Sequence, residues 1–464
     1  MKFIYEWPCV DGKHRPPAHA IAGHANTVPV TAMASQEQTT VATKPGKTPT
    51  TVVDALRTFL MASIFVGHYG IFLTGIHYPG PMYMAGDFAV SGFFGISDTI
   101  MVWAYCKEDP FTERRSRVEF ILKRAARLLP VYYVTLIIAN VFDLGANSGM
   151  GDFQSPRVRI FDFLLLNCWV GEVVEQAPAG LMWMIQVFFW ISFMFPYAVR
   201  FCHNHLKEHS NRLPSSRILL YFLFCYLNPV LVASFFVFSK GWPFEDCPSN
   251  CPPFPHLPTD PYTLETWMRP VWRTRENPLS RLAPLLLCVH ISLACKRGWR
   301  APGWLKVLSF IGSLTSWYFS WIASTHMATE AWFLTEYIGL PYMATAMPLL
   351  VVAERDGELK WLASTSLLKW LQANAGVGLS FYCWQGAIID SFRKYFLVYE
   401  PLRETGIGRH LTVKEAFQTM PLALGFAFMV SSFSLALIEA PLSESARVHL
   451  LERVMPPKAK GDLM

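Results

Sequence analysis

The chain has 464 residues, of which 52% are hydrophobic and 16% are charged, and its formal net charge is +6. Because about a quarter of the residues in a soluble domain are charged, this composition argues against a string of soluble domains and indicates a membrane protein. The basic residues lie in short loops between apolar runs and not in a block with stacking aromatics, which argues against a nucleic-acid surface.

The first part of the chain, residues 1–53, is rich in Thr, Ala, Pro and Gln and contains no long apolar run. The missing apolar run argues against a secretory signal peptide, and the composition argues against a packed domain. We expect a disordered cytosolic tail, with an organelle transit peptide as the alternative.

Apolar segments long enough to be membrane helices then recur along the chain. The segment at 160–171 is too short to span comfortably and is expected to be re-entrant or interfacial. The sequence therefore predicts an all-α, polytopic bundle of ten to eleven membrane segments within residues 54–445, followed by a cytosolic tail at 446–464. The apolar segments are 55–75, 86–105, 118–142, 160–171, 181–199, 217–238, 279–295, 305–324, 331–353, 367–392 and 418–438.

The charges of the loops orient these segments. Loops on the cytosolic side carry an excess of Lys and Arg, so placing the basic loops there predicts ten crossings with both termini inside. The basic loop at 393–415 then falls outside, which leaves eleven crossings open. A multi-pass protein of the plasma membrane or an endomembrane follows. The basic loops are 106–117, 200–217, 296–306 and the tail after Pro441, whereas 76–85 and 325–330 have no Lys or Arg.

Ten cysteines are scattered through the chain, and Cys247 and Cys251 fall together in a long polar loop. They could form a disulfide on a non-cytosolic side or remain two thiols, and two ligands are too few to predict a zinc site. Three histidines at 203, 205 and 209 lie in a basic stretch that we expect to be a solvated loop. No metal site is predicted.

The first apolar segment, "DALRTFLMASIFVGHYGIF", contains Arg57 and His68, which are 11 positions apart. At helical spacing they differ by about 20° in direction and by roughly 16 Å along the axis, so both lie on one face. Arg57 could be a snorkelling anchor, and His68 could make an interhelical hydrogen bond. Ionisable groups inside a membrane are nevertheless functional candidates.

A second basic pair lies in "FILKRAARLLPVYY", where Arg124 and Arg127 share a helix face. Lys123 and Arg124 could be ordinary interfacial charges, but Arg127 lies deeper in the segment. Together with Arg57, three guanidiniums at one depth predict an anion site suited to phosphate. A ligand with phosphates at one end and a reactive group on a long arm, such as acyl-coenzyme A, would fit between this site and the histidine.

These residues resemble the motifs of the acyltransferase-3 family of integral membrane acyltransferases. The resemblance extends from about residue 51 to residue 445, and it depends on the order and spacing of several short motifs. They are R-x10-H at Arg57 and His68, "VSGFFGISDTI" with Phe93, Phe94 and Ser97, R-x-x-R at Arg124 and Arg127, "LMWMIQVFFWISFMFP" with Trp183, and "LIEAPLSE" with Glu439 and Pro441.

Several positions depart from the family pattern. Ser91 and Asp98 stand where the family usually has Asp and Gly, and Gln385 stands in place of a late histidine. The glutamate that commonly follows the tryptophan is missing after Trp183. The arginine and histidine positions are intact, so these departures affect the acceptor side more than the donor side.

The resemblance implies transfer of an acyl group, expected to be acetyl, from acyl-CoA to a hydroxyl of a glycan or small metabolite. Acyl-CoA is then a co-substrate, with no permanently bound cofactor, and the lipid bilayer is the surrounding medium. Arg124 and Arg127 would hold the CoA phosphates with help from Arg57. His68 would act as general base or carry the acyl group. Candidate acceptor or oxyanion contacts are Ser97, Trp183, Gln385 and Glu439.

Two other functions fit the same residues. A transporter or channel could use the arginines and the histidine for passage of an anionic or lipid substrate. A non-catalytic relative could bind acyl-CoA or lipid without turnover. The first predicts flux without consumption of acyl-CoA, and the second predicts saturable binding without product.

Overall fold

The computed structural model describes most of the chain after residue 50, and these residues are helical with no strand. The first helix begins at Thr51, so the predicted tail falls almost wholly outside the described residues, as do Cys247 and Cys251. The described ranges are 51–74, 81–106, 110–142, 156–170, 182–240, 277–326, 330–392 and 412–454.

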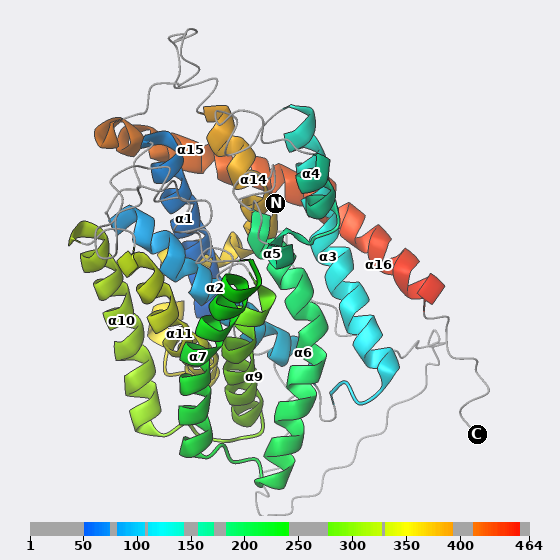
Figure 1. The fold of residues 1–464 in the computed structure, drawn as a ribbon, viewed down its shortest axis with the longest axis vertical. Helices are drawn as coiled ribbons and strands as arrows, with labels where there is room; N and C mark the ends of the chain where they lie inside the picture. Colours follow the sequence, from blue (N-terminus) through cyan, green and yellow to red (C-terminus); the bar gives the residue numbers. More distant parts are fainter. Residues whose placement is uncertain are drawn as a thin grey trace, which may run out of the picture. The chain divides into compact units, whose positions relative to one another are not determined.

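Figure 1 shows the helices of this bundle. Two short elements, η3 and η4, are 3₁₀-helices, and η6 is π-helical. In chain order the elements are α1 (Thr51–Thr74), α2 (Pro81–Tyr105), α3 (Arg114–Val141), α4 (Pro156–Phe163), α5 (Asn167–Val170), α6 (Trp183–Glu208), α7 (Ser215–Lys240), η3 (Pro278–Arg281), α9 (Leu282–Lys296), α10 (Gly303–His326), α11 (Glu330–Arg355), α12 (Lys360–Ala363), α13 (Ser366–Ala373), η4 (Ala375–Val377), α14 (Gly378–Ser391), α15 (Val413–Ser434), η6 (Leu435–Glu439) and α16 (Ala440–Val454).

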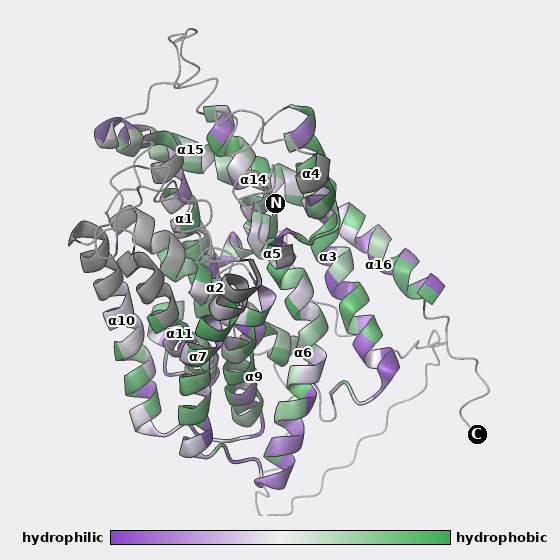
Figure 2. Ribbon diagram, in the orientation of Figure 1, coloured by the Kyte–Doolittle hydropathy of each residue, from purple (hydrophilic) through white to green (hydrophobic). Residues whose placement is uncertain are grey.

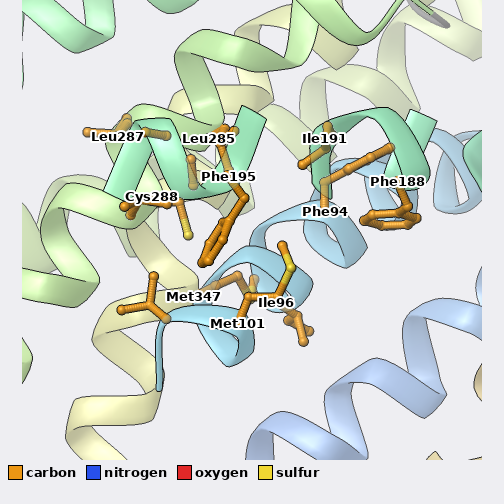
Figure 3. Close-up of a cluster of buried hydrophobic side chains, with 14 of the residues drawn as sticks. Phe94, Ile96, Met101, Phe188, Ile191, Phe195, Leu285, Leu287, Cys288 and Met347 are labelled. Atoms are coloured by element: carbon orange, nitrogen blue, oxygen red, sulfur yellow. The ribbon is translucent and has the colours of Figure 1, made fainter. Parts of the chain in front are cut away.

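The main core lies where α2, α6, α9 and α11 meet. In an 18-residue window of the span formed by η3 and α9, 83% of the residues are buried, whereas only 22% are buried in such a window of the span from Lys414 to Val454. The η3–α9 span is therefore enclosed by other helices, and α15 and α16 lie at the periphery. Figure 3 shows Phe94, Ile96 and Met101 of α2 with Phe188, Ile191 and Phe195 of α6, Leu285, Leu287 and Cys288 of α9, and Met347 of α11.

Six of the described helices are long and apolar enough to cross a membrane. The all-helical class is therefore confirmed, and the count of ten to eleven segments stays a prediction. Figure 2 shows hydrophilic residues at the start of α3 and the end of α6, which adjoin two of the basic loops. Phe111, just before α3, packs on Phe195 near the middle of α6.

One predicted span is broken in two. The prediction of a continuous segment over 367–392 is wrong, because α13 ends at Ala373 and α14 begins at Gly378 after the 3₁₀ turn of η4. None of the α13 residues is buried, whereas most of α14 is. A Cβ at Gly378 would lie 3.4 Å from the Met61 sulfur, an ordinary van der Waals distance, so α14 packs against α1 at this position.

The short segment near 160–171 forms α4 and α5, which have eight and four residues. A hydrogen-bond network joins Asp162 and Asn167 of this segment to Tyr132 of α3 and Gln186 of α6. Gln186 donates to the Tyr132 hydroxyl at 3.0 Å and to Asp162 Oδ1 at 3.1 Å, and Asn167 also donates to Asp162. Since a buried polar group is costly only when it lacks a partner, this network explains how Asp162 and Asn167 of this short segment pack among apolar helices.

The expectation of a solvated loop at 202–209 is wrong. Helix α6 continues through this stretch to Glu208, and His203 and His205 are buried. Arg297 donates to His203, and Arg217 donates to His205 Nε2 at 3.1 Å. Likewise, α16 continues to Val454, so the predicted domain boundary at 445 falls inside a helix packed on α3.

A carboxylate from α11 caps the first helix. Glu354 Oε2 accepts hydrogen bonds from the backbone N–H groups of Val52 at 3.0 Å and Val53 at 3.4 Å. The first N–H groups of a helix have no partner within it, and a negative charge there also interacts favourably with the helix dipole. Buried Glu354 therefore fixes the start of α1 against the end of α11.

We predict that Glu354→Ala lowers the free energy of unfolding by about 1–2 kcal/mol, because two buried backbone donors lose their acceptor. Thermal unfolding of the purified full chain in detergent measures this loss. Glu358→Ala is the matched control, because Glu358 is exposed and pairs with Lys306 at 3.6 Å. The control should stay within about 0.5 kcal/mol of the parent. Equal stability of the two variants would contradict the cap.

Candidate functional site

Arg57 and His68 both face the segment formed by η4 and α14. The Arg57 Nη2 donates to the Ala375 carbonyl oxygen at 2.7 Å, and His68 Nδ1 lies 3.2 Å from Gln385 Oε1. Arg57 precedes His68 in α1, and their partners Ala375 and Gln385 follow in the same order. Helices α1 and α14 therefore run side by side in the same direction. The spacing predicted one shared face, and the structure places both side chains on it.

The contact with Gln385 defines the protonation of the histidine ring. An amide carbonyl oxygen can only accept a hydrogen bond, so the Nδ1 of His68 is the donor. In the neutral ring the lone pair then lies on Nε2, the nitrogen on the far side of the ring. Gln385 is completely buried and His68 is half-buried. The glutamine therefore holds the imidazole in the form that can accept a proton through Nε2.

The Arg57 guanidinium lies among charges from three other positions. Its Nη2 is 3.4 Å from Asp54 Oδ1, one turn earlier on α1. It also interacts electrostatically with Arg127 of α3 and with Glu439 at the end of η6. Positions 57, 127 and 439 are far apart in sequence, and packing of α1, α3, α14 and η6 brings them together.

Glu439 is placed by the π-helical segment. Pro441 has no N–H group, so the Leu437 carbonyl cannot receive the hydrogen bond of a regular α-helix. The helix widens over Leu435–Glu439, and the Glu439 side chain is buried. Ser380 of α14 donates to Glu439 Oε2 at 2.6 Å, and Arg127 and Arg57 interact with the carboxyl group electrostatically. Such π-segments often occur at functional sites.

A second group of charges adjoins the first. Arg124 interacts electrostatically with Arg127, its neighbour on α3, and with Asp98 of α2. Asp98, which stands at a family glycine position, also interacts with Arg281 of η3. Arg281 is buried, and its guanidinium carbon lies 4.8 Å from the centre of the Phe94 ring. Three of these guanidiniums are the predicted ones, and Arg281 is a fourth.

Two members of the site were missed by sequence reasoning. Arg281 follows the long loop and opens the apolar segment at 279–295, and a charge inside an apolar run was the signal that could have revealed it. Ser380 gave no signal, because a serine in a membrane helix commonly bonds to its own backbone. Its contact with Glu439 depends on the π-segment, which the sequence did not predict.

Buried donors of the site that have no hydrogen-bond acceptor among the described residues include the Nε atoms of Arg57 and Arg124 and the Nε2 amide of Gln385. A buried donor without an acceptor costs about 1–3 kcal/mol, so such groups are uncommon in the absence of a ligand. Two belong to guanidiniums and one adjoins His68.

Two other predicted site residues lie on α2 and α6. Ser97 is half-buried on α2. Trp183 is buried at the start of α6, and its ring centre lies 6.4 Å from that of Phe94. Trp183 therefore borders the Phe94 and Arg281 contact. Within the described residues no group of three or more His, Cys, Asp or Glu side chains could hold a metal ion.

Comparison with protein families decides the membership of the chain. The acyltransferase domain of the acyltransferase-3 family matches residues 51–438. The chain belongs to the acyltransferase-3 family. The match begins at the first residue of α1 and ends one residue before Glu439. No curated protein and no solved structure matches the chain.

Because the chain belongs to the acyltransferase-3 family, it is assigned to a family of membrane acyltransferases. Its six apolar helices agree with this assignment. The arginine and histidine positions that carried the resemblance fall within the matched residues. In the structure Arg57 contacts Ala375 of η4, and His68 contacts Gln385 of the following helix α14.

We predict that Ser380→Ala lowers the free energy of unfolding by about 1–3 kcal/mol, because the buried Glu439 carboxylate loses its hydroxyl donor. Thermal unfolding of the full chain in detergent measures the change. Ser391→Ala is the matched control on the same helix, because Ser391 donates only to the Ala387 carbonyl at 2.7 Å. A loss in the control as large as that at Ser380 would contradict the proposed contact.

Proposed function

We propose that the protein is a multi-pass membrane acyltransferase that moves an acyl group from acyl-CoA to a hydroxyl of a glycan or small metabolite. The observation that carries this proposal is the pairing of His68 with Gln385 on the same pair of helices that holds Arg57 against Ala375. This arrangement would hold a base and an anion site on one scaffold, and family membership supports the reaction class.

The arginines would bind the phosphates of the donor. Arg127 interacts with both Arg57 and Arg124, and each of the three interacts with a carboxyl group. Guanidiniums form bidentate contacts with phosphate oxygens. The unpartnered Nε atoms of Arg57 and Arg124 offer additional donors. His68 lies 11 positions further along α1, roughly 16 Å from Arg57, so the pantetheine arm would extend along this helix toward the imidazole.

At the histidine, Nε2 of His68 would take the proton of the acceptor hydroxyl as its oxygen attacks the thioester carbonyl carbon. The tetrahedral intermediate then collapses, the carbon–sulfur bond breaks, and the CoA thiolate takes the proton back from the imidazolium. The products are the acyl ester and free CoA, so no further reactant is required. Nε2 is suited to this role because Nδ1 donates to Gln385.

Gln385 would have two roles in this reaction. Its Oε1 orients His68, and its buried Nε2 has no acceptor among the described residues. That amide could donate to the carbonyl oxygen as negative charge develops on it, which is how an oxyanion is stabilised. A glutamine at the family's histidine position is therefore compatible with acyl transfer. Ser97, Trp183 and Glu439 remain candidate contacts for the acceptor or the oxyanion.

The test uses the purified full chain and acetyl-CoA with a labelled acetyl group. We predict that His68→Ala lowers the rate of transfer by about 10²–10⁴-fold, because the general base is lost, while acetyl-CoA binding is largely preserved. Release of free CoA and transfer of label to a panel of glycans and hydroxylated metabolites measure the rate.

Variants at Gln385 are the controls for this experiment. Gln385→Leu removes both the acceptor for Nδ1 and the amide donor, so we expect a large loss of rate, whereas Gln385→Glu keeps an acceptor for Nδ1 and should lose less. Unchanged transfer by His68→Ala would refute the role of the histidine. Binding of acetyl-CoA without transfer by the parent would favour a non-catalytic relative.

We predict that Arg127→Gln weakens acetyl-CoA binding by about 10- to 100-fold, because a charge-assisted contact with phosphate is lost. Equilibrium binding of labelled acetyl-CoA measures the effect. Lys123→Gln is the control on the same helix, because Lys123 pairs with Glu119 at 2.6 Å and should leave binding near that of the parent. An equal loss in both variants would indicate general electrostatic attraction and not a built phosphate site.

A further inference from the structure

The segment α12–α13 presents apolar side chains that no described residue covers. Neither helix has a buried residue. Trp361 is 69% exposed, Leu367 is 64% exposed and Trp370 is 56% exposed. Leu367 and Trp370 are three positions apart, so they project within about 60° of each other on one side of α13. Lys360 and Lys369 are exposed in the same segment.

This apolar surface is continuous with the lipid-facing side of the bundle. The Trp370 ring centre lies 6.4 Å from that of Phe428 on α15. Helix α15 belongs to a candidate membrane span and exposes Leu422, Met429 and Phe433. Because one surface extends from α13 onto a membrane helix, the same medium covers both.

The neighbours of the segment place it at an end of the spanning helices. Helix α13 packs on α1, where Thr58 donates to the Leu371 carbonyl oxygen at 2.9 Å. Thr58 lies in the first third of α1. On the other side, Glu358 pairs with Lys306 at 3.6 Å, next to the basic loop at 296–306. That loop is one of those predicted to face the cytosol.

We propose that α12–α13 lies in the interface of the membrane leaflet on the side of the basic loops. Trp361, Leu367 and Trp370 enter the boundary between headgroups and acyl chains. Lys360 and Lys369 remain at the level of the phosphates. Short amphipathic helices with tryptophan on one side and lysine on the other bind phospholipid in this way. The occupant of the exposed surface is therefore phospholipid and not a second protein.

This position would give the lipid a structural role at the arginine site. The Ala375 carbonyl that accepts from Arg57 follows α13 by two residues, and the Leu371 carbonyl that accepts from Thr58 lies within it. A segment held at the depth of the headgroups therefore also holds the Arg57 guanidinium at a defined depth. The inference itself does not depend on the acyl-transfer reaction.

The experiment uses the full chain in liposomes of phosphatidylcholine and phosphatidylglycerol. Brominated phosphatidylcholine quenches the fluorescence of nearby tryptophan. The fluorescence of Trp361 and Trp370 is obtained by subtracting the emission of the double variant Trp361→Phe/Trp370→Phe from that of the parent. We expect bromine near the glycerol backbone to quench this difference by roughly half or more, and bromine near the chain end to quench it less, because an interfacial helix is shallow. Trp183, which is 4% exposed, is the control. Its fluorescence is obtained in the same way from the Trp183→Phe variant and should be quenched little.

Each other outcome overturns the proposal. Quenching by aqueous iodide and not by brominated lipid would place the segment in water. Stronger quenching by bromine near the chain end would place it within the hydrocarbon core, as part of a spanning helix. Quenching by neither would show that protein covers the surface. Both substitutions keep an aromatic ring, and size-exclusion profiles equal to the parent's confirm that the variants are folded.

Discussion

A guanidinium buried among apolar helices is stable only where oxygen atoms from other segments lie close to it, because its desolvation costs several kcal/mol. Arg57 meets this requirement through Asp54 and the Ala375 carbonyl, and Arg127 through its interaction with Glu439. Arg124 and Arg281 share Asp98. The helices that supply these partners must therefore stay in register with those that carry the arginines.

The contacts that stabilise the buried charges also hold the residues of the site in position. Helix α14 alone contacts Arg57 through the preceding η4 turn, His68 through Gln385, and Glu439 through Ser380. An ion pair fixed in this way needs little reorganisation when an anionic ligand arrives, which favours both binding and electrostatic catalysis. Asp98 shows that a departure from the family pattern can be absorbed, because its carboxyl group lies among two guanidiniums, those of Arg124 and Arg281.

Much of this arrangement could be predicted from residue spacing, and the reasons for the failures are local. The 11-residue separation of Arg57 and His68 fixes their common face in any α-helix, so no knowledge of packing was needed. The break between α13 and α14 was missed because Leu367, Leu368 and Leu371 are apolar enough to extend the span. The buried His203 and His205 were missed because a run of polar residues at a helix end resembles a loop. The contact between His68 and Gln385 depends on how two distant helices pack, which no local pattern encodes.

The widened turn before α16 has a consequence for the end of the chain. A π-turn contains one residue more than the equivalent α-helical turn, so everything after it is rotated by about 100° relative to a regular continuation. The face of α16 that meets α3, including Ser443 against the Arg127 carbonyl at 3.4 Å, is set by that single extra residue. The number of residues between Ser434 and Pro441 therefore sets the rotation of α16 about its axis. That rotation in turn determines which α16 side chains lie against the backbone at Arg127.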